Sequence, residues 1–438
     1  MTDRSQRSAA LARANAALKA DSLQLLADLV EAGKGGPEAV DAVTRQAMQE
    51  ADCDVVAFEY DPRSVPLVDE FASVAAATAL PERCLTATIA GASGGPSLLM
   101  FAHPDTEDFH TEPVWQTDPF VPTVRDGRIY GWGVADDLAG IALLVQSVAI
   151  LRAAGLRPGG DVVLVSSPSK KHRCGISAAL HRGLSADAAI YLHPAESGRG
   201  LNEIKAFAPG QLEFMISIAG HPPDTSEPAH TAFASRAVNP FDKAMIVARA
   251  LHAVDAERGQ RVVHPKLQQA IGRSTNLMLS FCDFGAAGEL SRIADECKLG
   301  GAMTLVPGES LAEVMENVEA AIGAASATDP WLSDNPPAVV WLSGVSAAET
   351  QEESALYQTV SSVLTRCGAN PQVNPLHTSS DIRNPIVQKA IPTVGFGPLC
   401  GGLTMSGHAD EWVDADDYLR AIAATAEIIT EWCGADFS

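Results

Sequence analysis

Four short apolar segments, each with the length and composition of a buried strand, constrain the folding of this chain more than any other feature. They span Ser97–Phe101, Asp161–Ser166, Ala188–Leu192 and Ile391–Phe396. From Asp136 onward, between the first two, apolar residues recur with helical spacing on one face of a long segment. Strands that alternate with helices predict an α/β fold with a parallel sheet. Such sheets bind ligands just beyond the carboxyl ends of their strands.

Side chains that can bind a metal ion or carry a charge follow three of these segments directly. His103 and Asp105 follow the first, in the run Ala-His-Pro-Asp. Lys170 and Lys171 follow the second, and His193 follows the third. Because the carboxyl ends of parallel strands share one edge of a sheet, we expect these side chains at a common edge.

Three further runs carry candidate functional residues. A glycine-rich run, Gly-Trp-Gly-Val-Ala-Asp, ends at Asp136, although this aspartate would also suit an ordinary helix N-cap. The run Gly-His-Ala-Asp-Glu contains His408, and the run Thr-Ser-Ser-Asp-Ile-Arg ends at Arg383. A single histidine at a strand end is usually a structural residue, so it is the order of these residues along the chain that indicates a functional site.

The order and spacing of these elements resemble the aminoacylase and carboxypeptidase family of co-catalytic metallohydrolases, from about residue 20 to residue 435. This family includes acetylornithine deacetylase, succinyl-diaminopimelate desuccinylase and the cytosolic dipeptidases. The resemblance implies a zinc-peptidase-like catalytic domain with a mixed, mostly parallel sheet, and an inserted ferredoxin-like α+β domain that serves as a lid and in dimerisation. We expect the catalytic domain at residues 1–206 and 346–438 and the lid domain at residues 207–345, where strand and helix patterns follow a βαββαβ order.

The resemblance also implies roles for individual residues. His103 matches a metal ligand, and Asp105 matches the carboxylate that orients it. Asp136 matches the aspartate that bridges two metal ions, and His408 matches a ligand of the second ion. Where the family has an acidic ligand of the first ion, this chain has His193.

The largest departure from the family pattern lies at Lys170 and Lys171, where the family has a Glu-Glu pair that supplies the general base and a ligand of the second ion. A protonated lysine has no lone pair, so it can neither ligate a metal ion nor accept a proton from water. We therefore predict one divalent ion, Mn, Zn, Co or Fe, held by His103, Asp136 and His193. A lysine beside Asp136 would place a positive charge near the vacated second position.

Without the glutamate base, the nucleophile would be water activated mainly by the metal ion. His408 is the first candidate to take up the proton, since it is released from metal binding and an imidazole titrates near neutral pH. A neutral, desolvated Lys170 or Lys171 is an alternative base, although this pair could equally be a solvated charge pair on a loop.

The resemblance implies three further contacts. Arg383 matches an arginine that holds the substrate carboxylate. His230, in the predicted lid domain, matches a histidine that reaches the active site of the partner subunit and stabilises an oxyanion there, which implies a homodimer or higher homo-oligomer. Trp132 stands where an arginine is common, and it is expected either to pack in the interior or to stack on the substrate.

Three functions fit this pattern. The first is a one-metal hydrolase of a C–N bond in a small carboxylate-bearing substrate, including an aminohydrolase of an activated aromatic amine, as in the nitroanthranilate aminohydrolase offshoot of the family. The second is a pseudoenzyme that binds a ligand without turnover. The third is an ordinary two-metal peptidase or deacylase.

Composition indicates the setting. A net charge of −23 over 438 residues argues against nucleic acid and anionic membranes as partners. The eight cysteines are scattered without short-spaced pairs, and no continuous apolar segment of signal-peptide or membrane-spanning length is apparent, so we expect a cytoplasmic protein.

Overall fold

The computed structural model describes residues 2–72, 81–106, 109, 112–169, 175–377 and 380–437. Its contacts divide the chain into two compact units. The first comprises Met1–Pro66, Val74–Ala208 and Glu349–Ser438, and the second comprises Leu67–Ser73 and Pro209–Ala348. The second unit thus takes in a short segment near residue 70 as well as the central insertion.

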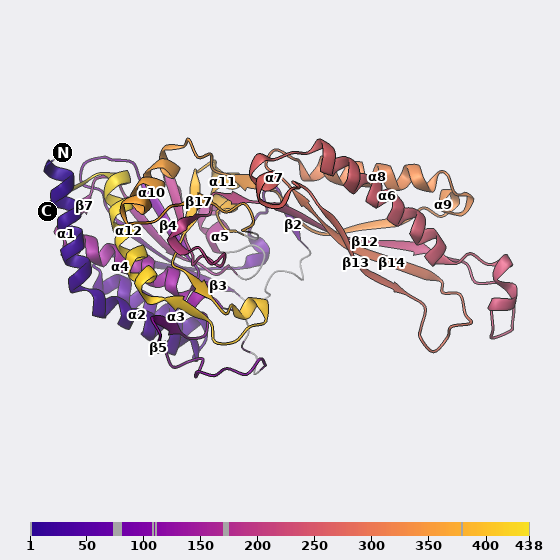
Figure 1. The fold of residues 1–438 in the computed structure, drawn as a ribbon, viewed down its shortest axis with the longest axis horizontal. Coiled ribbons are helices and arrows are strands. Elements are labelled where there is room, and N and C mark those ends of the chain that lie inside the picture. Colours follow the sequence, from indigo (N-terminus) through magenta and orange to yellow (C-terminus); the bar gives the residue numbers. More distant parts are fainter. Residues whose placement is uncertain are drawn as a thin grey trace. The chain divides into compact units, whose positions relative to one another are not determined.

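A six-stranded mixed sheet forms the centre of the first unit (Figure 1). In spatial order its strands are β1 (Asp54–Tyr60), β3 (Glu82–Ile89), β8 (Val162–Ser166), β4 (Leu98–Ala102), β9 (Ala188–Leu192) and β18 (Thr393–Phe396). The last four are mutually parallel, and β3 runs antiparallel to both of its neighbours, β1 and β8. The predicted α/β fold with a mixed, mostly parallel sheet is confirmed.

Helices cover both faces of this sheet. The larger layer contains α1 (Thr2–Ala17), α2 (Lys19–Gly33), α3 (Pro37–Glu50), α4 (Ala139–Ala153), α10 (Ala355–Arg366) and α12 (Ala415–Cys433), and the smaller layer contains α5 (Gly175–His181) and α11 (Arg383–Lys389). Alternate strand residues face the two layers: Met100 and Ile190 pack against the larger layer, and Phe101 and Tyr191 against the smaller. Each such apolar side chain contributes about 1.5–3 kcal/mol when fully buried.

The central helix α4 explains the long apolar stretch of the sequence. By length and composition, Val134–Ala153 could span a membrane, but 94% of its most apolar window is buried inside the structure. It packs against α12, α2 and the strands of the sheet, as a core helix does. The sequence just before α4 is therefore held firmly at the edge of the sheet.

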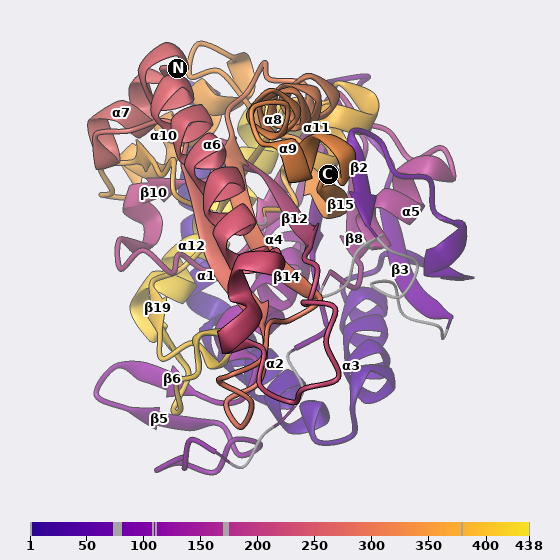
Figure 2. The same ribbon diagram turned by 90° about the vertical axis from the view of Figure 1, so that its right-hand side faces the viewer.

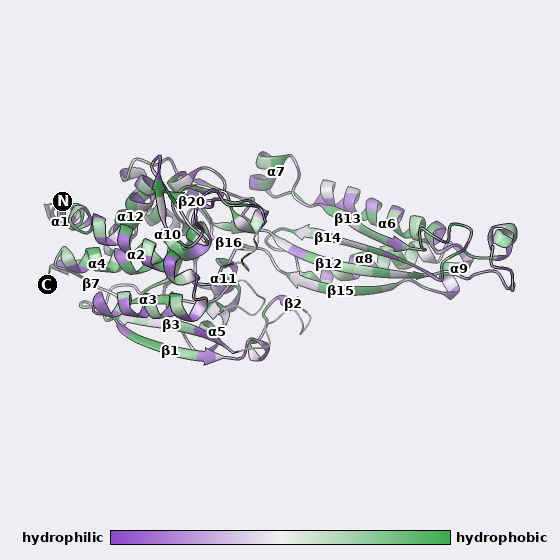
Figure 3. Ribbon diagram, turned by 90° about the horizontal axis from the view of Figure 1, so that it is seen from below, coloured by the Kyte–Doolittle hydropathy of each residue, from purple (hydrophilic) through white to green (hydrophobic). Residues whose placement is uncertain are grey.

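The second unit is an antiparallel sheet with helices on one face. Its strands, in spatial order, are β13 (Leu277–Phe284), β14 (Glu296–Leu305), β12 (Gly210–Ala219), β15 (Ala338–Val345) and β2 (Glu70–Ala72). Helices α6 (Pro240–Arg261) and α8 (Leu311–Ser326) lie next to each other (Figure 2), and hydrophobic and hydrophilic residues alternate along them (Figure 3). The buried residues Val314, Val318 and Ile322 show the spacing of one helical face. Four strands and two helices thus follow the predicted βαββαβ order.

The remaining elements are short. They include β5 (Thr123–Arg125), β6 (Arg128–Tyr130), β7 (Leu156–Pro158), β10 (Glu203–Ile204), β11 (Phe207–Ala208), β16 (Ala348–Glu349), β17 (Gln372–Val373), β19 (Cys400–Gly401), β20 (Trp412–Asp414), β21 (Ala435–Phe437), α7 (Pro265–Ile271) and α9 (Pro330–Asp334). Within the first unit the two ends of the chain lie close together, and Arg4 forms an ion pair with Glu431 at 2.7 Å (Figure 1).

Strand register decides which residues meet at the edge of the first sheet. Phe101 of β4 pairs with Tyr191 of β9, and both strands end within two residues of that pair. His103 and His193 therefore leave neighbouring parallel strands at the same level. The turn that leads into α4 lies at the same edge.

Candidate metal centre

His103, Asp136 and His193 converge at the carboxyl ends of β4 and β9. Oδ1 of Asp136 lies 3.2 Å from Nε2 of His103 and 3.4 Å from Nε2 of His193. The imidazole centroids are 5.6 Å apart. All three side chains are buried, with at most 4% of each residue exposed. The structure thus brings together the three residues that the sequence indicated as metal ligands.

Backbone acceptors hold the other nitrogen of each imidazole. Nδ1 of His103 lies 2.9 Å from the carbonyl oxygen of Asp105, and Nδ1 of His193 lies 2.9 Å from the carbonyl oxygen of Pro194. A carbonyl oxygen only accepts hydrogen bonds, so each Nδ1 carries the proton. Each Nε2 then directs a lone pair at the Asp136 carboxylate, unless it is protonated as well.

This arrangement fits a transition-metal ion. Three acceptor atoms that face one another repel unless a proton or a cation lies between them. For a tetrahedral ion with bonds of about 2.0–2.1 Å, the ligand atoms are about 3.3 Å apart. The separations of 3.2 Å and 3.4 Å from Asp136 to the two histidines match that value. His103, Asp136 and His193 together offer two nitrogen ligands and one oxygen ligand.

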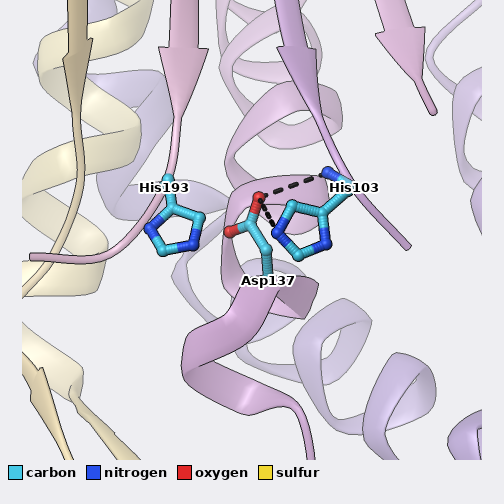
Figure 4. A group of neighbouring side chains, drawn as sticks. All are labelled: His103, Asp137 and His193. Carbon is cyan, nitrogen blue, oxygen red and sulfur yellow. Dashed lines mark hydrogen bonds and ion pairs between the residues drawn. The ribbon is translucent and has the colours of Figure 1, made fainter. Parts of the chain in front are cut away.

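A second carboxylate, Asp137, lies beside this group. One carboxylate oxygen of Asp137 and one nitrogen of each imidazole lie within 4.8 Å of one another. Figure 4 shows the Asp137 side chain between the two rings. However, Oδ2 of Asp137 is 4.0 Å from Nε2 of His103 and accepts the backbone N–H of His103 at 3.2 Å. Its Oδ1 accepts the N–H of Gly140 at 3.1 Å. Asp136 thus makes the shorter contact with His103, whereas the carboxylate of Asp137 is bound by two backbone N–H groups and adds negative charge.

Excess negative charge governs the electrostatics of the site. Burial lowers the pKa of His103, but hydrogen bonds to Asp105 and Asp136 and the charge of Asp137 outweigh it and hold that pKa well above its ordinary value. The pKa of His193 is also raised, because Asp137 and other carboxylates outweigh the effect of burial. Burial raises the pKa of Asp137 to about 6, even though both imidazoles lower it. The field that retains protons here also attracts a divalent cation.

Asp105, which was predicted to orient a metal-binding histidine, lies beside His103. Its Oδ1 lies 3.3 Å from Nδ1 of His103, and both of its carboxylate oxygens accept the N–H of Ser169. The Ser169 hydroxyl donates to the carboxylate of Asp381, whose own pKa is raised by burial. Asp105 thus connects the first histidine to the loop after β8. Lys170 and Lys171, which continue that loop, lie outside the described residues.

The other predicted residues of the first unit lie in different surroundings. His408 is exposed, in a turn after residues 404–406, and its backbone N–H donates to Leu403. Arg383 is buried at the start of α11, where its guanidinium contacts Asn384 at 3.4 Å. Trp132 is 5% exposed, and its indole N–H donates to Thr106. Trp132 was expected either to pack in the interior or to stack on the substrate, and its burial and its contact with Thr106 are those of a packed residue.

His230 belongs to the second unit. It is half-buried, and its Nδ1 accepts the N–H of Ile293 at 3.3 Å. An accepting Nδ1 means that a neutral His230 carries its proton on Nε2. The side chain of a neutral His230 can therefore donate a hydrogen bond from Nε2.

Two groups near the site were not singled out from the sequence. Glu411 is fully buried, and its carboxylate accepts the N–H of Ala135 at 2.7 Å and the hydroxyl of Thr404 at 2.8 Å. Burial and the charge of Asp136 raise the pKa of Glu411 to about 7. Its position three residues after His408 was the available signal. Glu411 fastens the turn that carries His408 to the residue before Asp136.

The second group is a buried ion-pair network behind His193. Oε2 of Glu196 lies 3.2 Å from Nδ1 of His377, and its Oε1 lies 3.7 Å from Nδ1 of His193. Although burial raises the pKa of Glu196, both histidines and Lys205 outweigh it and hold that pKa well below its usual range. Nζ of the fully buried Lys205 donates to the carbonyl oxygens of His193 and Pro194. The network fixes the backbone that presents His193.

Comparisons with known proteins agree with this architecture. The model of Peptidase family M20/M25/M40 matches residues 99–431. An N-formyl-4-amino-5-aminomethyl-2-methylpyrimidine deformylase of Halalkalibacterium halodurans is 25% identical over 354 residues, which cover 77% of this chain and 79% of the relative. A tripeptidase from Staphylococcus aureus has a similar structure, with a TM-score of 0.67, 17% identity and coverage of 95% of this chain and 98% of the other. A dinuclear metal-binding M20 peptidase from Bacillus subtilis gives a TM-score of 0.58 and 14% identity over 95% of this chain and 99% of the other.

The fold and the buried histidine–carboxylate cluster define a metal-dependent hydrolase. The family model covers well over half of the sequence, and the chain belongs to Peptidase family M20/M25/M40. The protein is accordingly a hydrolase that acts on C–N bonds, a group that includes amide and peptide bonds.

Proposed function

We propose that this protein hydrolyses a C–N bond in a small carboxylate-bearing substrate with one divalent transition-metal ion held by His103, Asp136 and His193. One observation carries the proposal: three buried acceptor atoms converge at 3.2 Å and 3.4 Å with the proton of each imidazole committed to a backbone carbonyl. When bound, the ion lowers the pKa of water and polarises the group under attack.

The surrounding residues keep this donor set in place. The carboxylate and the backbone carbonyl oxygen of Asp105 both face Nδ1 of His103 and keep its proton there, which leaves Nε2 to bind the ion. The Pro194 carbonyl accepts the Nδ1 proton of His193, and Lys205 donates to the carbonyl oxygens of His193 and Pro194, which holds that segment in place. Asp137 adds a negative charge that favours a cation without occupying the shortest contact.

Proton transfer is assigned to His408. Glu411 and the backbone of the same turn bond to Ala135 and Gly131, so the turn lies against the residues that precede Asp136. An exposed imidazole can pass a proton to solvent, which suits a group that takes a proton from the site. The lysine pair of the sequence is the alternative base.

The substrate class follows from Arg383, whose buried guanidinium is proposed to bind the carboxylate as a bidentate partner. An amide of an amino acid satisfies this requirement. An aromatic amine beside a carboxylate, such as a nitroanthranilate, satisfies it too, and its electron-poor ring would compensate for the missing glutamate base.

We also propose a cytoplasmic homodimer that assembles through the second unit. Its edge strand β13 exposes Met278, Phe281 and Phe284, each at least 46% accessible. An exposed apolar edge strand is suited to pairing with another chain. Across such an interface His230 would reach the partner's site. The described cysteines are all free thiols, which fits a reducing compartment.

Metal analysis of the purified protein tests the proposal. We expect one equivalent of ion to be retained or loaded, and activity in a screen of N-acyl amino acids and anthranilates with added Mn²⁺. Two equivalents with cleavage of N-acyl amino acids would establish the ordinary two-metal peptidase instead. A failure to bind any ion under any condition would favour the pseudoenzyme.

Two variants refine this experiment. Replacing the lysine pair, as Lys170→Glu and Lys171→Glu, is expected to create a second binding site, and a stoichiometry that stays at one would mean that these positions are not the vacated ligand sites. Mixed dimers of His230→Ala with Asp136→Ala are expected to recover up to about a quarter of the wild-type activity, because one of the two shared sites is then intact in half of the molecules. An inactive mixture would exclude a shared site.

A further inference from the structure

Cys282 and Cys297 form a pair of thiols at the base of one hairpin of the second unit. Cys282 lies on β13 and Cys297 on β14, which run antiparallel to each other (Figure 1). The residue opposite Cys297 is Phe284, two positions after Cys282. Because opposite residues share a face of the sheet, the two cysteines are diagonal neighbours on one face.

The two thiols are in contact but differ in exposure. Cys297 is fully buried in the apolar core of this unit, whereas Cys282 is exposed. A hydrogen bond joins the two side chains, and burial together with this contact raises the pKa of the Cys297 thiol to about 12. An oxidant in solution can therefore reach Cys282, and Cys297 is the neighbour that can react with the oxidised sulfur.

The backbone at this position can accommodate a disulfide. In the described part of the chain, β13 pairs on one side only, with β14, and the pairing is irregular between Leu279 and Phe281. Diagonal neighbours lie about 7–8 Å apart, which is somewhat more than the Cα separation in a disulfide. A strand at the sheet edge beside such an irregularity can move toward its neighbour by that difference.

The loop that these cysteines enclose holds His230. The loop, residues 285–295, joins β13 to β14 and has no regular secondary structure. The carbonyl oxygen of Ser291 accepts the N–H of His230 at 2.9 Å, and the N–H of Ile293 donates to Nδ1 of His230 at 3.3 Å. A covalent bond at the base of the loop reduces its freedom to open, so it stabilises both contacts.

We infer that Cys282 and Cys297 are a reversible oxidation site, at which hydrogen peroxide links the two thiols and the disulfide orders the loop that binds His230. In the first step the sulfur of Cys282 attacks a peroxide oxygen, the O–O bond breaks, and water leaves with the thiol proton, which gives a sulfenic acid. In the second step the sulfur of Cys297 attacks that of Cys282. An S–S bond then replaces the S–O bond, and a second water leaves with the proton of Cys297. The thiols lose two electrons in total, which the peroxide accepts, and a dithiol reductant reverses the reaction.

Peptide mapping of the full-length protein under non-reducing conditions tests the oxidation site. Treatment with hydrogen peroxide should join the two cysteine peptides into a product lighter by two hydrogen atoms, and dithiothreitol should separate them. Cys282→Ser should abolish the cross-link. Cys367→Ser, a change at a partly exposed cysteine of the first unit, is the matched control and should leave the cross-link intact. Failure of the cross-link to form, or a disulfide between the Cys282 residues of two subunits, would overturn the inference.

Hydrogen exchange tests the effect on the loop. After the peroxide has been removed, exchange of the Ile293 amide, which donates to His230, should be slower by about tenfold or more than in the reduced protein. The midpoint of thermal unfolding should rise by about 5 °C. Cys282→Ser treated in the same way should show neither change. A cross-link that leaves the exchange of Ile293 unchanged would refute the connection to His230.

An effect on activity rests on the proposed function, in which His230 serves the partner's site. Ordering the loop should raise kcat for an N-acyl amino acid by about twofold or more in the wild type, and His230→Ala should not respond to oxidation. If the cross-link forms and slows exchange but kcat does not change, the proposed role of His230 fails and the oxidation site stands. Peptide mapping requires no substrate, so it also separates the failure of the oxidation site from the failure of the proposed function.

Discussion

The assignment of Asp136 rather than Asp137 as the metal ligand gives the sharpest prediction. The two residues are adjacent, both are buried, and both face the imidazoles. They differ in distance to His103, which is 3.2 Å for Asp136 and 4.0 Å for Asp137. Exchanging each in turn for asparagine changes charge at nearly constant volume, so each variant is the control for the other.

The expected magnitude follows from the loss of one charge next to a divalent ion. At an effective dielectric constant of about 20, two unit charges about 4 Å apart interact by about 4 kcal/mol, and a doubly charged ion doubles this figure. If desolvation of the carboxylate offsets half of the gain, about 4 kcal/mol is lost in Asp136→Asn, which is about a thousandfold in the dissociation constant.

Asp137→Asn should behave differently. Its two carboxylate oxygens accept the N–H groups of His103 and Gly140, and an asparagine amide can satisfy only one of them. We expect a loss of about 1–3 kcal/mol in the free energy of unfolding, with metal affinity reduced by about tenfold or less. Isothermal titration calorimetry with Mn²⁺ or Zn²⁺ and urea denaturation of the metal-free protein provide the two measurements. Equal losses of affinity in the two variants, or a larger loss in Asp137→Asn, would refute the reasoning.

Three other predictions concern pH and the polar residues that support the fold. The pKa values of His103 and His193 are raised, so a metal ion must displace their protons when it binds. The logarithm of the association constant, measured by competition titration, should therefore rise by up to about two per pH unit and level off above the raised pKa values. An association constant that does not depend on pH would contradict this prediction. Burial raises the pKa of Asp41 from 3.8 to about 6, so its contribution to stability is fully present below pH 3.8 and lost as the pH rises through about 6. Asp41→Asn should therefore stabilise the protein at pH 7 by about 2 kcal/mol, after allowance for partial solvent screening, with almost no effect at pH 3.5, as thermal denaturation at the two pH values would show. Glu411→Ala should lower the free energy of unfolding by about 1–3 kcal/mol because the Ala135 N–H loses its acceptor, whereas Glu411→Gln should lose less; equal losses would mean that the carboxylate acts only through its volume.

The fold was accessible from the sequence because its signals are local. The apolar runs around Met100, Leu164 and Ile190 are strands, and the segment after Asp136 is a helix with one face on the sheet. Hydrophobic periodicity reports such elements without knowledge of the rest of the chain. The segment near residue 70 was not assigned to the central unit, because its pairing with β15 joins residues more than 250 positions apart.

The candidate site was accessible only in part. His103 and His193 follow strands that are parallel neighbours, so their convergence follows from topology. The pairs Glu411–Ala135 and Glu196–His377 join separate loops, and hydrophobic periodicity does not predict such contacts. Likewise, the burial of Trp132 and the exposure of His408 depend on which segments cover each loop.

The sequence by itself determined the strands, the helices and the residue types that stand at the strand ends, because these depend on neighbours a few positions away. Only the tertiary structure decided that the carboxylate of Asp136 lies closer to Nε2 of His103 than the carboxylate of Asp137 does. It also decided that Nε2 of His103 and Nε2 of His193 face the same carboxylate. These contacts of Asp136 join segments distant in the chain and exist only once the sheet has formed, whereas the hydrogen bonds from each Nδ1 to the carbonyl oxygens of Asp105 and Pro194 are local.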